Sequence, residues 1–339
     1  MFLGEISGFR SRYLLLSTAE PSPSAYLVRL VAVSSLMLLD TASLYFRAFY
    51  GVPDTVRAPD GTPVNAVRGL LDFISRLVEE YDPTHLACCW DNDWRPQWRV
   101  DLIPSYKAHR VEEVVPGGSD VEEVPDPLQV QIPIILEVLE AFGIAVIGAD
   151  GYEADDVIGT LATGAGMPVE IVTGDRDLFQ LVDDGAGVRV LYTARGVGRH
   201  ERISEDVVRE KYDVNADQYA DFATLRGDSS DGLPGVAGVG EKTAATLLKR
   251  FGSIAGIRAA AADPASELAP GPRRKIQDAA PYLDVASEVV AVARSIDLGS
   301  PDLRLPATPA AADALAELAE RWGLGTPVQR LSAVLSGSR

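Results

Sequence analysis

The 339-residue sequence predicts an α/β fold with a central, mostly parallel sheet flanked by helices, on the strength of two observations. First, short apolar runs of β type stop at acids: one ends on Asp40, another on Asp91, and a third is followed by Asp175. Second, the segments between these runs have the apolar spacing of amphipathic helices, as in 64–81 and 128–142. Alternating strands and helices are typical of a parallel sheet, whose ligands bind at the carboxyl ends of the strands.

The chain divides by pattern into three parts. Residues 1–29 hold several serines and two prolines ahead of the first convincing element, and predict a flexible extension. Residues 30–202 carry the alternating pattern of an α/β domain. From 203 to 339 strand-like runs largely disappear and Ala-rich helical segments take over, which predicts a second, helical region. Within the α/β part, the acidic, proline-rich stretch 111–127 predicts a mobile loop.

The composition limits the class of protein. Hydrophobic residues make up 47% of the chain, but no apolar run approaches the roughly 20 residues of a membrane span, so we expect a cytoplasmic protein with no membrane partner. The only cysteines, Cys88 and Cys89, are adjacent within an apolar run and offer no disulfide framework. The formal net charge of −18 argues against a nucleic-acid partner unless much of it is local to one site.

The acids that could form such a site are nine carboxylates placed where apolar runs stop or helices begin. Carboxylates crowded together raise one another's pKa unless cations lie between them. Oxygen-only ligands favour hard ions, so the sequence predicts Mg²⁺ or Mn²⁺ against a phosphate, and no His/Cys cluster suggests zinc. The nine account for half of the formal charge: Asp40, Asp91, Glu153, Asp155, Asp156, Asp175, Asp177, Asp228 and Asp231.

Each acidic motif also has an ordinary structural reading. In GYEADDVIGTLA the acids can all face one site only if a helix begins there, and they could simply cap it. Asp175 and Asp177 could form an Asx-type turn. Asp228 and Asp231, before the helix-stopping GLPG, could belong to a turn as well. The combined pattern favours a metal site, because every ordinary reading would have to hold independently.

The glycine-rich GVAGVGEKT resembles a phosphate-binding loop without matching it. Glu241 stands between Gly240 and Lys242, where a P-loop requires glycine followed directly by lysine. The amphipathic run that follows instead indicates a helix-hairpin-helix of about 228–252, whose second helix would offer backbone amides to a DNA phosphate. A glycine turn between two packed helices is the alternative. Bases beside the turn favour DNA; the residues expected to contact it are Gly238, Gly240, Lys242, Thr243 and Lys249.

Basic and aromatic residues alternate between the second and third acidic positions. This interleaving suits an unstacked single strand, through phosphate pairing and ring stacking, although a solvated loop with buried tryptophans would look similar. Phe46 and Arg47 follow Asp40 and could contribute too, or belong to the core. The cations of the segment are Arg95, Arg99, Lys107 and Arg110, and its rings are Trp94, Trp98 and Tyr106.

Taken in order, GYEADDVIGTLA, VTGDRDLFQL, RGDSSDGLPGVAGVGEKTAATLL and the basic YKAHR resemble the 5′-nuclease (flap endonuclease) superfamily. The likeness is greatest to the 5′→3′ exonuclease domain of bacterial DNA polymerase I, here as a free-standing protein, and covers about 31–335. It implies a PIN-like α/β domain, a helical arch at about 92–133, and a helix-hairpin-helix of the H3TH type. Two departures from the family pattern are the acidic arch segment and the extension 1–29.

The resemblance also implies roles for individual residues. One metal would be held mainly by Asp40, Asp91 and Asp155, with Glu153 acting partly through water. The second metal would be held by Asp175, Asp177 and Asp228, and Asp156 and Asp231 would complete this set of ligands. Lys107 matches the family's catalytic lysine and Arg110 its basic neighbour, Phe46 matches a base-stacking aromatic, and a potassium ion often binds the helix-hairpin-helix.

The function expected from these observations is hydrolysis of DNA phosphodiesters by a two-metal mechanism, as a 5′→3′ exonuclease and 5′-flap endonuclease in replication and repair. Catalysis would centre on Lys107, Arg110, Asp40, Asp155 and Asp175, and DNA binding would add Phe46, Arg47 and Arg99. The expected partners are DNA with a 5′ end, flap or nick, and RNA-primed fragments. We expect the chain to act as a monomer near the nucleoid. A non-catalytic DNA-junction scaffold and a ribonuclease of the related acidic α/β type are the alternatives.

Overall fold

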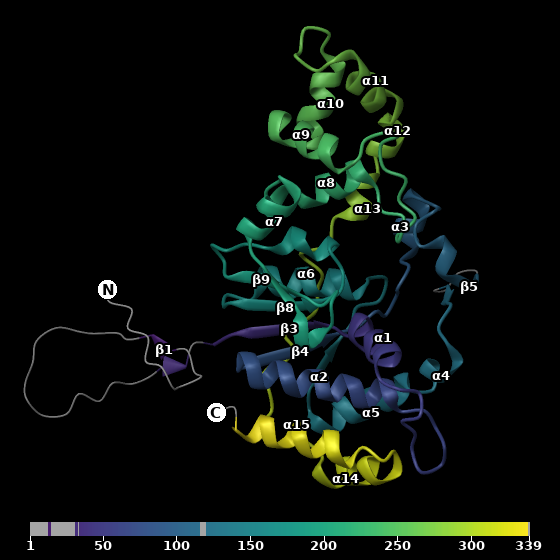
Figure 1. The fold of residues 1–339 in the computed structure, drawn as a ribbon, viewed down its shortest axis with the longest axis vertical. Helices are drawn as coiled ribbons and strands as arrows, with labels where there is room; N and C mark the ends of the chain where they lie inside the picture. The colour runs from purple at the N-terminus through teal and green to yellow at the C-terminus, as the bar shows by residue number, and fades with distance from the viewer. Residues whose placement is uncertain (1–12, 15–30, 33, 116–119, 338–339) are drawn as a thin grey trace, which may run out of the picture.

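A computed structural model describes residues 13–14, 31–32, 34–115 and 120–337 (Figure 1). The predicted extension 1–29 therefore lies outside the described residues except for β1 (Tyr13–Leu14), which pairs antiparallel with β2 (Val31–Ala32). Among the described residues, no helix is both long and apolar enough to cross a membrane.

The centre of the molecule is a six-stranded sheet in the order β10-β9-β8-β3-β4-β7. All neighbouring strands run parallel except β10, which is antiparallel to β9, so the mostly parallel sheet is confirmed. The strands are β3 (Leu36–Asp40), β4 (His85–Cys89), β7 (Ala145–Ile147), β8 (Val169–Thr173), β9 (Val188–Tyr192) and β10 (Glu201–Ile203).

The strands separate two cores because successive side chains point to opposite faces. In β3, Leu36 and Leu38 belong to one core, whereas Met37 and Leu39 belong to the other. The first core is covered by α6 (Ala154–Gly164) and the 3₁₀ turn η2 (Asp177–Leu181), and the second by α1 (Thr41–Gly51), α2 (Asn65–Tyr81) and α5 (Ile132–Phe142).

The arch segment, residues 92–133, is made of short pieces rather than one long helix. They are α3 (Gln97–Leu102), η1 (Ala108–Arg110), the antiparallel strands β5 (Val111–Glu113) and β6 (Val121–Glu122), and α4 (Asp126–Gln129). Figure 1 shows the segment along the outside of the molecule, from α3 beside the helical region to α4 near α5. The stretch predicted as a loop, 111–127, thus carries a strand pair where it is described.

The helical region stands above the sheet in Figure 1. It contains α7 (Glu205–Tyr212), η4 (Ala216–Gln218), α8 (Tyr219–Arg226), α9 (Glu241–Phe251), α10 (Ile254–Ala262), α11 (Pro270–Asp278), α12 (Ala280–Leu283) and α13 (Ala286–Val290). Helices α8 and α9 flank the glycine-rich turn, in the arrangement expected of a helix-hairpin-helix.

The predicted region 203–339 needs a correction at its end. Helices α14 (Ala312–Arg321) and α15 (Gly325–Gly337) leave the helical region and pack on α5 and α2, below the sheet in Figure 1. Trp322 and Leu331 are buried in the same core as Leu70 and Phe142. An apolar helical stripe shows that a helix packs somewhere, but not on which layer, so the sequence pattern alone could not place these helices.

Candidate active site

Three acids meet at the carboxyl edge of the sheet. Asp40 ends β3 and caps α1, where one oxygen accepts from the Ser43 amide at 3.1 Å and the other from the Thr173 hydroxyl at 2.7 Å. Asp91 follows β4 and accepts from the Ala154 amide at 2.8 Å, which ties β4 to the start of α6. Asp175 follows β8, the strand beside β3.

These acids line a cavity of about 250 Å³ at this edge. Of the predicted metal ligands, Asp40, Asp91, Glu153, Asp155 and Asp175 line it, and of the predicted basic and aromatic residues, Phe46, Trp94, Lys107 and Arg110 do. The helix start that the metal-site interpretation of GYEADD requires is present: α6 begins at Ala154 with Glu153 as its N-cap, so the acids of GYEADD surround the first turn.

The cavity acids share an unfavourable electrostatic environment. Burial, and then the negative charges of Asp91 and Asp175, raises the pKa of Asp40 to about 7. Burial also holds the pKa of Asp155 well above its usual range, and the charges of Asp175 and Asp40 add to it. Such mutual repulsion is what a cation between the side chains would relieve.

A second acidic group adjoins the first through Asp175. Burial raises the pKa of Asp177 well above normal, with further contributions from the charges of Asp175, Asp231 and Asp228. One Asp177 oxygen, Oδ1, is buried and has no hydrogen-bond partner within the described part of the chain. Asp228 differs: burial would raise its pKa, but hydrogen bonds from Ser230 and the charge of Arg226 outweigh burial and lower it.

The residues present fit hard divalent cations. All donors in both groups are carboxylate oxygens, and the buried, unpartnered oxygen of Asp177 is the kind of atom that an ion would satisfy. Across the described ranges, no three His, Cys, Asp or Glu side chains already close around a single point as the ligands of one ion do. Asp40, Asp91, Asp155 and Asp175 instead face the cavity.

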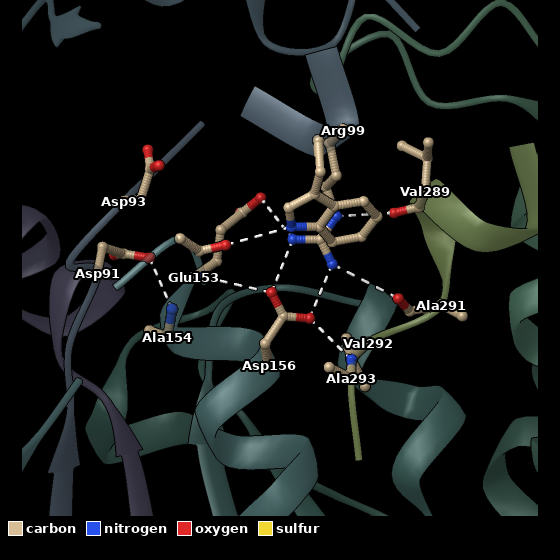
Figure 2. A network of polar contacts seen from close by, with 12 residues as sticks. Asp91, Asp93, Arg99, Glu153, Ala154, Asp156, Val289, Ala291, Val292 and Ala293 are labelled. Atoms are coloured by element: carbon tan, nitrogen blue, oxygen red, sulfur yellow. Dashed lines mark hydrogen bonds and ion pairs between the residues drawn. The ribbon is translucent and has the colours of Figure 1, made fainter. Parts of the chain in front are cut away.

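Arg99 organises the acids behind the cavity (Figure 2). Arg99 as a whole is 2% exposed, and its guanidinium donates to both oxygens of Asp156, at 2.7 and 2.8 Å, and to Glu153 Oε1 at 2.9 Å. It also donates to the Val289 carbonyl at 3.1 Å, next to the end of α13. One side chain of the arch segment therefore joins the start of α6 to the helical region.

Two predictions are corrected by this network. Arg99 is buried among protein acceptors, so in this arrangement it is not a DNA-contacting residue. Asp156 is fully buried, and besides Arg99 its oxygens accept from the amides of Glu153 and Ala293, at 3.2 and 2.8 Å. No oxygen of Asp156 is left for an ion, and its charge instead holds Arg99 in place. The helical spacing correctly placed Asp156 near Glu153 but could not show which partner faces it.

Lys107 stands between the cavity and the helical region. Its ammonium contacts a Glu153 oxygen and donates to the Trp94 carbonyl at 3.3 Å, while its backbone amide donates to the Asp231 carbonyl at 2.9 Å. Burial alone would lower its pKa, but the Glu153 carboxylate outweighs burial and holds the pKa well above normal. Lys107 is therefore a fixed positive charge that lines the cavity.

Arg110, in the turn that follows Lys107, also lies between the cavity and the helical region. Its guanidinium donates to Asp231 Oδ1 at 2.8 Å and to the Ser230 carbonyl at 2.7 Å, and it also lines the cavity. Asp231 thus lies beside the basic residues as well as the second acidic group.

Sequence reasoning missed Thr173 and Glu122 as supporting residues, and named Tyr106 only as a ring that could stack on a base. The buried Tyr106 hydroxyl donates to Glu153 Oε1 at 2.7 Å, and the Thr173 hydroxyl orients Asp40. Glu122, on β6 of the arch segment, also lines the cavity. Thr173 carried a usable signal, since it ends the strand that leads to Asp175. Glu122 lay in an acidic stretch that suggested only a mobile loop.

The residues predicted to bind duplex DNA lie apart from the cavity, at the start of α9. Gly238 has a φ of 70°, a conformation that glycine adopts readily, and Gly240 caps α9. Lys242 and Lys249 are exposed, Lys249 with an ion pair to Asp213 at 3.0 Å. The Gly238 carbonyl accepts from Lys275 Nζ at 2.7 Å, so a lysine already meets one carbonyl of the turn.

This fold, with an acidic cavity at the carboxyl edge and a helix-hairpin-helix beyond it, is that of the metal-dependent 5′ nucleases. The zinc-bound 5′-exonuclease of bacteriophage T5 superimposes with a TM-score of 0.55 at 16% identity, over 90% of this chain and all of that one. The catalytic core of Rad2, solved with a DNA substrate, gives 0.58 at 16% identity, over 91% of this chain and 93% of that one. At such identities the likeness establishes the fold alone.

The sequence comparisons establish the family. Residues 35–213 match the model of the 5′-3′ exonuclease N-terminal resolvase-like domain, and 214–311 that of the 5′-3′ exonuclease C-terminal SAM fold. The chain therefore belongs to the 5′-3′ exonuclease family, and the predicted 5′-nuclease function is confirmed at that level. The nuclease family implies divalent metal ions, in agreement with the oxygen-only donor set.

Individual relatives support the same family assignment. A 5′-3′ exonuclease of Streptomyces coelicolor is 61% identical over 88% of this chain and all of the relative, and one of Mycobacterium tuberculosis is 52% identical over 89% of this chain and 98% of the relative. DNA polymerase I of M. tuberculosis is 45% identical over 66% of this chain but only 24% of its own length. The predicted likeness to the polymerase-linked domain is thus confirmed.

Proposed function

We propose that this 5′ nuclease removes 5′ flaps and 5′-terminal nucleotides from DNA, using Mg²⁺ or Mn²⁺, during replication and repair. The observation that carries the proposal is the cavity itself, in which Asp40, Asp155 and Asp175 face Lys107 and Arg110. An acidic wall that holds cations opposite fixed ammonium and guanidinium groups suits a scissile phosphate between them.

The position of each residue suggests its role in holding the ions and the substrate. Asp40, Asp91, Asp155 and Asp175 would hold one ion, and Asp175, Asp177, Asp228 and Asp231 a second, with Glu153 acting partly through water. When bound, the ions would supply Lewis acidity that promotes ionisation of a water and offsets charge on the phosphate. Lys107 would stabilise the developing negative charge, and Phe46, half-buried in the cavity wall, would support an unpaired base.

The helical region would hold duplex DNA through the first turn of α9. The amides at this helix start and the exposed Lys242 suit a phosphate. A potassium ion at the glycine turn would have to displace Lys275 from the Gly238 carbonyl. We further propose that the chain acts as a monomer at the nucleoid and accepts RNA-primed fragments.

The test is cleavage of end-labelled 5′-flap, nicked and blunt DNA by the purified chain, with Mg²⁺, Mn²⁺ or excess chelator. We expect cleavage near the flap junction with either metal and none with chelator, and comparable cleavage of a flap that carries a 5′ RNA segment. A chain that binds the flap but never cuts it with either ion would refute the proposal.

Lys107→Ala is expected to slow the chemical step by about 10²- to 10³-fold, because one preorganised charge at a transition state is worth roughly 3–4 kcal/mol. Single-turnover cleavage at saturating enzyme measures this step, and DNA binding in chelator measures affinity separately. Lys211→Ala, which removes an exposed lysine paired with Glu201, is the matched control and should cut normally. A loss confined to affinity in the Lys107 variant would reject the proposed role.

A further inference from the structure

The turn that carries Asp228 is fixed by close packing of its backbone. Gly227, the residue before it, has a φ of 78°, and a Cβ built there would lie 2.7 Å from the Leu233 carbonyl oxygen and 2.7 Å from the Gly235 amide nitrogen. Asp228 and Leu233 also exchange two backbone hydrogen bonds, at 3.0 and 2.8 Å. The backbone therefore sets the place of Asp228, and the partners of its two side-chain oxygens set the direction of the carboxylate.

Each oxygen of that carboxylate has a partner. Oδ1 accepts from the Ser230 amide at 2.8 Å and also from the Ser230 hydroxyl. Oδ2 of Asp228 accepts from Nη2 of Arg226 at 3.1 Å. Ser230 belongs to the turn itself, whereas Arg226 reaches the carboxylate from the last position of α8. Arg226 thus holds the oxygen that the turn does not hold.

Arg226 is itself fixed by its surroundings. Its side chain is only 11% exposed, and its Nε donates to the Gly227 carbonyl at 3.0 Å. The central carbon of the guanidinium lies 5.5 Å from the centre of the Phe222 ring, one helical turn earlier on α8. A guanidinium whose rotamer is locked by packing and hydrogen bonds can hold a carboxylate oxygen in one direction.

Arg226 also faces a second acid, Glu241, the first residue of α9. Their closest atoms, Nη1 and Oε1, are 3.6 Å apart, and Nη1 is buried with no hydrogen-bond partner among the described residues. The Glu241 side chain is 58% exposed, so water screens this contact, whereas both members of the pair with Asp228 are largely buried. The stronger contact of Arg226 is therefore the one to Asp228.

The charge of Arg226 acts on the whole second acidic group. Burial is the largest cause of the raised pKa of Asp177, and the charges of neighbouring acids add to it, but the charge of Arg226 acts in the opposite direction. For Asp228, hydrogen bonds from Ser230 and the charge of Arg226 outweigh burial and lower the pKa. Arg226 thus favours the ionised carboxylate, which is the form that binds a divalent ion.

Two arginines pair with acids of this group, but they differ in their access to the cavity. Arg110, which pairs with Asp231 at 2.8 Å, lines the cavity and could touch a phosphate there. Arg226 is not part of the cavity wall. Its contribution to cleavage would therefore pass through the residues that it contacts, and Asp228 is the one among them that belongs to the proposed ion site.

We propose that Arg226 is a positioning residue for the second ion, holding Asp228 in the direction in which its carboxylate meets that ion. The inference rests on the proposed function, since it concerns an ion site of the same nuclease. Removing a partner that orients a ligating carboxylate typically weakens metal binding by about 10- to 100-fold. A cation that merely competed with the metal for Asp228 would have the opposite effect, so metal affinity distinguishes the two roles.

The direct test is binding of Mn²⁺ by the DNA-free protein, followed through the electron paramagnetic resonance signal of the free ion. In Arg226→Ala the dissociation constant of one bound ion should rise by about 10- to 100-fold. Arg226→Lys, which keeps the charge but not the planar fork, should recover part of the affinity. A merely structural role would lower the melting temperature in chelator and leave Mn²⁺ binding unchanged.

The same defect should appear in cleavage as a greater demand for metal. At low Mg²⁺, single-turnover cleavage of a 5′-flap DNA by Arg226→Ala should be about tenfold slower or more than by the wild type, and raising Mg²⁺ should restore most of the rate. The dissociation constant for the flap DNA in chelator should follow the wild type, because Arg226 lies outside the cavity wall.

Two comparison variants make the assignment specific. Glu241→Gln keeps the pair of Arg226 with Asp228 and removes the charge of the other acid, so its Mn²⁺ binding should match the wild type. Arg209→Ala removes an exposed arginine of α7 that pairs with Asp206 at 2.7 Å. It is the matched control for the loss of an arginine–aspartate pair, and its Mn²⁺ binding should also be normal.

Unchanged or tighter Mn²⁺ binding by Arg226→Ala would overturn the positioning role. An equal loss of affinity in Glu241→Gln would overturn it as well, because the effect would then depend on the contact with α9. Wild-type protein that binds no Mn²⁺ and cuts no flap with either metal would instead refute the proposed function.

Discussion

Asp175→Asn is expected to abolish cleavage while making the metal-free protein more stable. Asp175 is the acid shared by the two carboxylate groups, and its charge helps to raise the pKa of Asp155 and of Asp177, after burial. Neutralising it removes a ligand from both proposed ion sites, so the rate should fall by about 10³-fold or more. It also removes repulsion from the metal-free fold, which should add about 1 kcal/mol to the free energy of unfolding.

Asparagine makes the change specific to charge. Its side-chain oxygen can still accept from the Asp177 amide, as Asp175 does at 2.8 Å. Thermal unfolding in chelator and in Mg²⁺ should show a higher melting temperature without metal and a smaller stabilisation by Mg²⁺ than in the wild type. Asp313→Asn, on the exposed first turn of α14, is the control that should alter neither activity nor metal response. Wild-type cleavage, or a less stable metal-free variant, would contradict the interpretation.

The same repulsion gives the metal-free wild type a characteristic pH dependence. The folded chain raises the pKa of Asp40 from 3.8 to about 7, mainly by burial. Between these values the folded state keeps a proton that the unfolded chain has lost, so this group's contribution to stability falls as pH rises from about 4 to about 7. Mg²⁺, which would favour the ionised carboxylate, should reduce that slope in thermal unfolding.

The carboxyl edge was predictable because its cause is local. An apolar run that stops at an acid shows both the strand and the place where its side chain emerges, and parallel strands bring such ends together. Asp40, Asp91 and Asp175 were found in this way, and the acids of GYEADD indicated the start of α6. None of these predictions required knowledge of distant contacts.

What the sequence could not show depends on partners far along the chain. Arg99 was predicted to contact DNA because an exposed cation among aromatic residues suits a nucleic-acid strand. In the structure it is buried against Asp156 and against the carbonyl of Val289, which lies 190 residues further along the chain. The return of α15 to α2 is likewise decided by which apolar stripes fit together.

Arg99→Ala is expected to destabilise the protein by about 3–5 kcal/mol, because it leaves the buried Asp156 carboxylate without its cation and Glu153 with Lys107 alone. Arg99 joins three parts of the molecule, so the loss should loosen the helical region from the start of α6 as well as lower the overall stability. Cleavage should fall even at temperatures where the variant stays folded, since Glu153 caps α6 at the cavity wall. Thermal unfolding and single-turnover cleavage at 15 °C measure the two effects separately.

Three further variants separate charge from geometry in this network. Arg99→Lys restores the charge but not the fork that meets both Asp156 oxygens, so it should recover only part of the stability. Adding Asp156→Asn to Arg99→Ala removes the buried charge that Arg99→Ala leaves unpaired. The double change should therefore be less destabilising than the sum of the two single changes.

Arg95→Ala is the matched buried control. Arg95 contacts Asp120 and the carbonyls of Pro104 and Tyr106, all within the arch segment, so its loss should leave the helical region attached to α6. If Arg95→Ala and Arg99→Ala exposed the helical region equally to proteolysis, the buried guanidinium of Arg99 would not be the link between the DNA-holding helices and the cavity.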